Sequence, residues 1–141
     1  MSPKPEVEPT WIEYIRSIDT PTLSNAIELL EVRARRDGFA PLGIRCLFLE
    51  FGRMCGFAVT AQVETISETE PFDIGRFVEL YAAIQSSPKP AVVVLQEIGG
   101  YPDYAAHCGE VMSTVFTRLG AIGLPPARGG AGSPRPDAGR I

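Results

Sequence analysis

Cysteine is scarce in this sequence and follows no familiar pattern. The three cysteines, Cys46, Cys55 and Cys108, are odd in number and lack C-x-x-C spacing. Such a set does not predict a disulfide framework. We therefore interpret all three as free thiols that pack within the protein in a reducing compartment.

An excess of positive charge is also lacking. The chain has 13 Lys and Arg against 17 Asp and Glu, a formal net charge of −4. Residues 125–141 hold three Arg and one Asp, a net of +2, so the first 124 residues carry −6. Direct nucleic-acid binding relies on Lys and Arg to neutralise phosphates. The acidic body argues against that function and is compatible with a basic protein partner or a divalent cation.

Long apolar runs are absent as well. No stretch approaches the roughly 20 apolar residues that a membrane-spanning helix needs. The first ten residues, MSPKPEVEPT, have no apolar centre of the kind found in a secretory signal. These features predict a cytoplasmic protein that has no membrane partner.

The composition that remains is typical of a folded domain. With 141 residues, of which 45% are hydrophobic, the chain is long enough to bury a core. We predict an N-terminal extension at 1–9, one domain at 10–124 and a tail at 125–141. Because 8 of the 17 tail residues are Pro or Gly, we expect the tail to be irregular, exposed and disordered.

Hydrophobic periodicity predicts the order helix, helix, strand, strand, helix, strand, helix, and therefore an α/β domain with at least one parallel crossover. The strands are expected at Cys46–Phe51, Phe57–Ile66 and Ala91–Leu95, and a loop at 33–45. The first helix is expected to start near Thr10, and the second to run from the N-cap Thr20 to Leu30. The third is expected from the cap Asp73 to about Ser86. The fourth is expected from Gly109 to Leu119, with Gly120 as the glycine that ends it. The last helix is expected to bury Val111, Met112, Val115, Phe116 and Leu119.

A candidate site lies where the last helix begins. Gly99-Gly100 follows a buried strand, and Gly109-Glu110 opens the helix behind it. The amides of Glu110, Val111 and Met112 belong to the first helical turn, where free N–H groups and the helix dipole attract a carboxylate or phosphate. Gly109 would let a ligand approach the backbone closely. An anion beside the Glu110 carboxylate would be repelled by it unless a cation lay between them, and Mg²⁺ suits such an all-oxygen site. The alternative is a helix start with a dipole-complementing Glu110 and no ligand.

Three nearby residues have ordinary structural interpretations beside a functional one. His107, the only histidine, is either a general base or metal ligand, or a partly buried loop residue. Cys108 invites a nucleophile interpretation, but the sequence supplies no orienting third group. Asp103 either binds a ligand or forms an Asx-type turn.

Asp19, Ser24 and Asn25, near the start of the chain, are interpreted as helix-capping residues.

Three segments together resemble a known family. DTPTLSNAIELL, GFAVTAQVET and AVVVLQEIGGYPDYAAHCGEVMSTVFTRLGAIGL resemble the RraA-like family, over about Tyr14 to Leu124. That family includes 4-hydroxy-4-methyl-2-oxoglutarate/4-carboxy-4-hydroxy-2-oxoadipate aldolases and the regulator of ribonuclease E activity. The segment from Gly109-Glu110 through G-x-x-G-L is the most specific part.

The resemblance implies a three-layer β/β/α domain that forms trimers, sometimes paired into hexamers. It implies a Mg²⁺- or Mn²⁺-dependent lyase that cleaves 4-hydroxy-2-oxo acids to pyruvate, with oxaloacetate decarboxylase activity. The oxo acid would bind at Gly109, Glu110, Val111 and Met112, and Glu110 would contact the metal through water.

The sequence departs from the family after Leu124. The family continues with a strand and an Asp-Gly-x-x-Arg-Asp motif, whose Arg binds substrate and whose final Asp binds Mg²⁺. Counted forward from Glu110, those two positions fall on Ala131 and Gly132, and neither Arg128 nor Asp137 matches the register. We therefore expect that this chain is a truncated or frameshifted member of the family. Its catalytic activity is expected to be impaired and its metal binding weak or absent.

The rival interpretation is a non-catalytic, protein-binding regulator of ribonuclease activity, which would not need the missing motif. A methyltransferase is disfavoured because no G-x-G-x-x-G follows a strand to hold a nucleotide-bearing cofactor.

Overall fold

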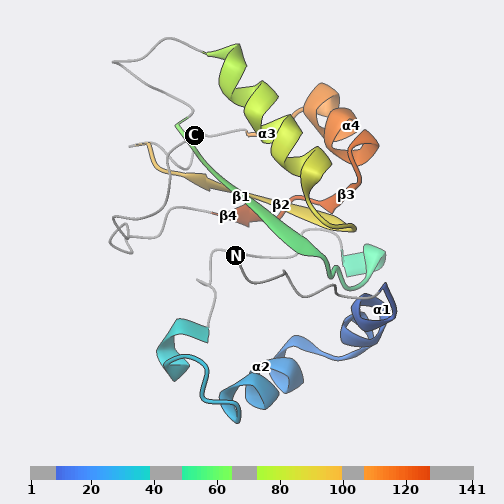
Figure 1. The fold of residues 1–141 in the computed structure, drawn as a ribbon, viewed down its shortest axis with the longest axis vertical. Helices are drawn as coiled ribbons and strands as arrows, with labels where there is room; N and C mark the ends of the chain where they lie inside the picture. Colours follow the sequence, from blue (N-terminus) through green and yellow to red (C-terminus); the bar gives the residue numbers. More distant parts are fainter. Residues whose placement is uncertain (1–8, 39–48, 65–72, 100–106, 128–141) are drawn as a thin grey trace. The chain divides into compact units, whose positions relative to one another are not determined.

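A computed structural model of the chain describes residues 9–38, 49–64, 73–99 and 107–127 (Figure 1). Contacts within the chain define two compact units, Met1–Ala40 with Phe48–Cys55, and Pro41–Leu47 with Gly56–Ile141. This division is not evident in the sequence, from which we predict one domain over 10–124. The described part of the first unit is helical, and the second unit holds the sheet.

The first unit begins with two short helices, α1 (Pro9–Ser17) and α2 (Thr20–Glu28). The N-cap of α2 is Asp19, whose carboxylate accepts hydrogen bonds from the Thr22 amide at 2.8 Å and the Thr22 hydroxyl at 3.0 Å. These bonds, the backbone one first, lower the pKa of Asp19. The prediction that Thr20 is the cap is wrong, because Thr20 is already the first helical residue. Ser24 and Asn25 lie inside α2 and do not cap it.

The C-terminal part of this unit also differs from the prediction. Because α2 ends at Glu28, Leu30 lies beyond the helix and is exposed. Two 3₁₀ helices follow, η1 (Arg35–Gly38) and η2 (Leu49–Phe51). The predicted strand Cys46–Phe51 is therefore wrong at its described end, and residues 46–48 lie outside the described residues. A short apolar run does not distinguish a strand from a helical turn.

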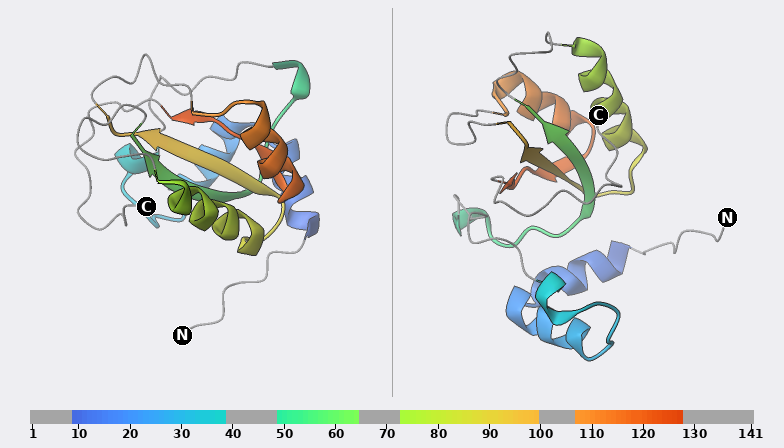
Figure 2. Two further views of the ribbon diagram at one scale, coloured as in Figure 1. Left: turned by 90° about the horizontal axis from the view of Figure 1, so that it is seen from above. Right: turned by 90° about the vertical axis from the view of Figure 1, so that its left-hand side faces the viewer.

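The second unit contains a parallel sheet (Figure 2). Strand β1 (Phe57–Val63) pairs with β2 (Ala91–Glu97) in the register Phe57↔Ala91 to Val63↔Glu97. On its other side β2 pairs in parallel with β3 (Ala121–Gly123) and β4 (Pro126–Ala127). The central position of β2 confirms the prediction that this valine-rich strand is buried. The α/β class with parallel crossovers is also confirmed.

The last two strands correct the expectation of an irregular segment from residue 125. Pro126 and Ala127 pair with Leu95 and Gln96 of β2, after β3 has paired with Ala91 and Val92. The neighbouring edge of β2 offers backbone partners that short pairings can use, even though proline lacks an N–H group. Residues 128–141 lie outside the described residues, so the rest of the predicted tail stays a prediction.

Helices α3 (Ile74–Ser86) and α4 (Glu110–Arg118) lie side by side over the sheet (Figure 1). Tyr81 and Phe116 make an edge-to-face contact between them, with ring centroids 6.0 Å apart. The core that they form with the sheet comprises Val59, Ala61, Leu80, Ile84, Ala91, Val93, Leu95, Phe116 and Ala121.

The burial of α4 only partly follows the sequence prediction. Phe116 is buried and Met112 and Leu119 pack against the core, but Val111 is 77% exposed. The next residue, Met112, takes the core-facing position in that turn, which points Val111 outward. Gly120 has a φ of +88°, so the predicted glycine at the C-terminal end of the helix is confirmed.

Asp73 caps α3 as predicted and offers a test of this fold. Its Oδ1 accepts a hydrogen bond from the Gly75 amide at 2.8 Å. We expect Asp73→Ala to lower the free energy of unfolding by about 1 kcal/mol in urea titrations, because the amide loses its acceptor. Asp73→Asn should retain most of the stability, since Asn is an equally good cap. If both variants lose the same amount, the charge contact with Arg76 at 3.8 Å matters more than the cap.

Candidate functional site

The candidate site lies where β2 ends and α4 begins. In open parallel sheets, ligands bind beyond the carboxyl ends of the strands. Gly109 is the N-cap of α4 and contributes no side-chain cap. The first helical hydrogen bond runs from the Ser113 amide to the Gly109 carbonyl at 3.0 Å. The amides of Glu110, Val111 and Met112 precede it, and a helix leaves these donors without an intrahelical partner.

Gly109 leaves room in front of these amides. Its backbone is extended, with φ −98° and ψ −172°, so no left-handed conformation requires glycine there. Apart from its two chain neighbours, no heavy atom of the described residues would lie within 4 Å of a Cβ built at this position. Nothing in the described residues therefore demands glycine at 109. That this glycine lets a ligand approach the backbone closely stays a prediction.

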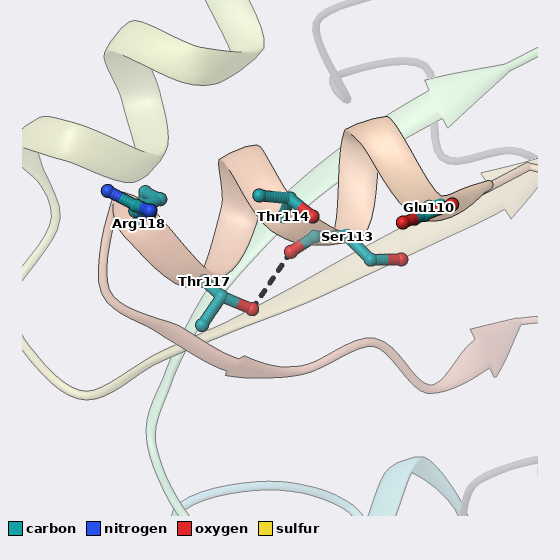
Figure 3. Close-up of a pocket in the computed structure, with 5 residues that line it drawn as sticks. All are labelled: Glu110, Ser113, Thr114, Thr117 and Arg118. Atoms are coloured by element: carbon teal, nitrogen blue, oxygen red, sulfur yellow. Dashed lines mark hydrogen bonds between the residues drawn. The ribbon is translucent and has the colours of Figure 1, made fainter.

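Glu110 is the first residue of α4, as predicted, and it is exposed. It lines an open hollow along the flank of the helix, together with Ser113, Thr114, Thr117 and Arg118 (Figure 3). The Thr117 hydroxyl donates to the Ser113 carbonyl at 2.8 Å, and the Ser113 hydroxyl donates to the Gly109 carbonyl at 2.9 Å. Both hydroxyls are thus engaged with their own helix.

This hollow differs from the candidate site predicted from the sequence, which lies at the helix start behind Gly99-Gly100. All five lining residues belong to α4, and Gly99 is not among them. Gly100 lies outside the described residues. The hollow presents one carboxylate at its amino end and Arg118 at its carboxyl end, which is the charge distribution that complements a helix dipole.

Among the described residues, no group of three or more His, Cys, Asp and Glu side chains is placed to hold a metal ion. The hollow beside Glu110 combines a single carboxylate with hydroxyls and a cation, whereas Mg²⁺ is usually held by several oxygens around carboxylates or phosphates. The role of Glu110 as a metal contact through water stays a prediction.

A residue that the sequence analysis does not single out is buried at the end of β2. Glu97, the last residue of β2, is 3% exposed. Its Oε1 accepts a hydrogen bond from the Gly99 amide at 2.7 Å, and its Oε2 lies 3.5 Å from His107 Nδ1. His107 is therefore partly buried beside a carboxylate. The signal in the sequence is a glutamate in phase with the core positions 91, 93 and 95.

Cys108 fits the packing interpretation of the thiols. It is free, half-buried and packed against the core. Its Sγ lies 3.2 Å from the Ser113 hydroxyl and 3.7 Å from the Gly109 carbonyl. Cys55 is also free, whereas Cys46 and Asp103 lie outside the described residues.

We compared the chain with known proteins. No protein-family model matches the chain, and neither a curated protein nor a solved structure is significantly similar to it. Within the described segments, no helix is both long and apolar enough to cross a membrane.

Proposed function

We propose that this chain is an RraA-like oxo-acid-binding domain of the metal-dependent aldolase and decarboxylase type. We also propose that it is catalytically inactive with its present sequence after Leu124. The observation that carries the proposal is the exposed start of α4 at the carboxyl edge of a parallel sheet. There the amides of Glu110, Val111 and Met112 precede the first helical hydrogen bond, and no heavy atom of the described residues beyond the chain neighbours lies within 4 Å of a Cβ built at Gly109. Such a terminus suits the carboxylate of a small oxo acid.

We infer inactivity because groups that the reaction needs are missing from the sequence. Cleaving a 4-hydroxy-2-oxo acid to pyruvate develops negative charge on the departing enolate, which a cationic group or metal must stabilise. The sequence has Ala131 and Gly132 where the resemblance requires Arg and Asp. Binding without turnover is what remains.

The proposal includes the three-layer β/β/α arrangement. One face of β1 carries Val59 and Ala61, which are buried under the helices, whereas Ala58 and Thr60 on the other face are exposed. In the proposed fold, a second sheet would cover this second face. The described residues supply the sheet and the helical layer.

The second candidate is a non-catalytic regulator that binds a protein. It is supported by apolar side chains left exposed on the two helices: Ile74 and Val78 on α3 are 71% and 60% exposed, and Val111 on α4 is 77% exposed. The net charge of −6 on the first 124 residues would suit a basic partner. The same exposed side chains also suit the proposed trimer or hexamer.

A pyruvate titration followed by NMR distinguishes the two functions. We expect pyruvate without metal to shift the amide signals of Glu110, Val111 and Met112. Glu110→Gln should tighten binding by roughly fivefold, because a like charge about 4 Å away costs on the order of 1 kcal/mol in water. Glu79→Gln removes a charge from the exposed surface of α3 and is the matched control. Signals that do not move at any pyruvate concentration would favour the protein-binding regulator.

A further inference from the structure

We propose that Glu97 is a positioning residue for the amino end of α4, an inference that rests on the oxo-acid site proposed above. Its carboxylate contacts two places that are separated in sequence by residues 100–106. Oε1 binds the Gly99 amide at 2.7 Å, and Oε2 lies 3.5 Å from His107 Nδ1. The same side chain thus connects the end of β2 to the residues that lead into α4.

The burial of Glu97 makes these contacts structurally important. The side chains of Glu97 and His107 are 2% and 16% exposed. A carboxylate removed from water is costly unless hydrogen bonds and an opposite charge compensate it. Glu97 therefore favours arrangements in which Gly99 and His107 stay beside it. Because Gly109 and Glu110 follow His107 closely in the chain, holding His107 restricts where the helix begins.

Gly99 shows how closely the chain passes this carboxylate. A Cβ at position 99 would lie 2.6 Å from Glu97 Oε1 and 3.2 Å from Glu64 Cγ. Neither distance leaves room for a methyl group without a shift of the neighbouring side chains. Gly99 has no positive φ, so an alanine there would be opposed by the nearby carboxylate and not by the backbone conformation.

The sign of the effect separates positioning from simple electrostatics. Glu97→Gln keeps the side-chain length and removes a negative charge beside His107, two residues before Gly109. Charge alone would then strengthen the binding of pyruvate or leave it unchanged. Loss of positioning should weaken it by about tenfold, since displaced donors bind poorly. Glu79→Gln, which removes the same charge from an exposed site, is the control.

The experiment measures amide hydrogen exchange and pyruvate affinity by NMR on the full chain. In Glu97→Gln we expect the Ser113 amide to exchange about tenfold faster while Leu119, at the far end of α4, is unchanged. The ring signals of His107, the sole histidine, should move in Glu97→Gln and stay in place in Glu79→Gln. Gly99→Ala should displace the carboxylate without removing its charge. If Glu97→Gln fails to fold, Ser113 exchange and pyruvate affinity in Gly99→Ala test the positioning role instead.

Each outcome bears on one proposal. Unchanged Ser113 exchange in both variants would overturn the positioning role, as would faster exchange with pyruvate affinity equal to or above that of the wild type. If the wild-type chain does not bind pyruvate, the proposed function fails, and the exchange of Ser113 still decides whether Glu97 holds the helix start.

Discussion

The 141-residue chain is expected to release pyruvate from 4-hydroxy-2-oxo acids, and to decarboxylate oxaloacetate, at the background rate with Mg²⁺. Losing one preorganised charge-stabilising group typically lowers a rate by ~10²–10³. If the proposed resemblance holds, Ala131 and Gly132 stand where the family has an Arg and a metal-binding Asp. The two losses act on the same enolate, so they need not multiply. A coupled pyruvate assay, run with Mg²⁺ and again with chelator, measures this directly.

The matched experiment restores what is missing. A chain in which a family-type strand and Asp-Gly-x-x-Arg-Asp segment follow Leu124 should regain chelator-sensitive turnover. Glu110→Gln in that repaired chain should lower turnover again, because its carboxylate would then support the metal. Robust chelator-sensitive turnover in the unrepaired chain would show that other residues form the site.

Replacing Ile84 with alanine should cause a large loss of stability. Ile84 is fully buried on α3 within the core that also contains Leu80 and Phe116. Removing its side chain loses buried apolar surface and leaves a cavity under the sheet. Such substitutions lower the free energy of unfolding by about 2–5 kcal/mol. Urea unfolding followed by circular dichroism provides the measurement.

Val78→Ala is the control on the same helix. Val78 is 60% exposed, so its truncation should change stability by no more than about 0.5 kcal/mol. Equal losses in the two variants would mean that the exposed face of α3 is covered in solution, as a trimer or a protein partner would cover it. Equal losses would therefore contradict the assignment of the core to the sheet-facing side alone.

The elements with strong local signals could be predicted from the sequence. Three consecutive valines identify β2, Asp73 marks the start of α3, and Gly120 marks the end of α4. Each signal acts through neighbouring residues, by propensity, capping or a positive φ. The fold class follows from their order, because a strand, helix and strand in succession favour a parallel crossover.

The elements that depend on distant partners could not be predicted. Strands β3 and β4 are short, and they form because β2 offers a free edge. The run at Leu49–Phe51 is too short for periodicity to choose between strand and helix. Thr20 and Asp19 are adjacent, and both are favourable caps, so only the geometry of the Thr22 amide identifies Asp19.

The candidate site shows the same division. Glu110 at the start of α4 follows from glycine punctuation and helix periodicity, which are local. The role of Glu97 depends on His107, ten residues away, and on the close approach of Gly99. A glutamate at the end of a buried strand is visible in the sequence, but its partners are not.

A crystal structure of the 141-residue chain with bound pyruvate or oxalate tests the central claim most directly. The claim predicts a carboxylate group at the start of α4, with its oxygens about 3 Å from the amide nitrogens of Glu110, Val111 or Met112. A protein side chain or backbone carbonyl already occupying those amides would contradict it. An anion bound only elsewhere on the chain would contradict it equally.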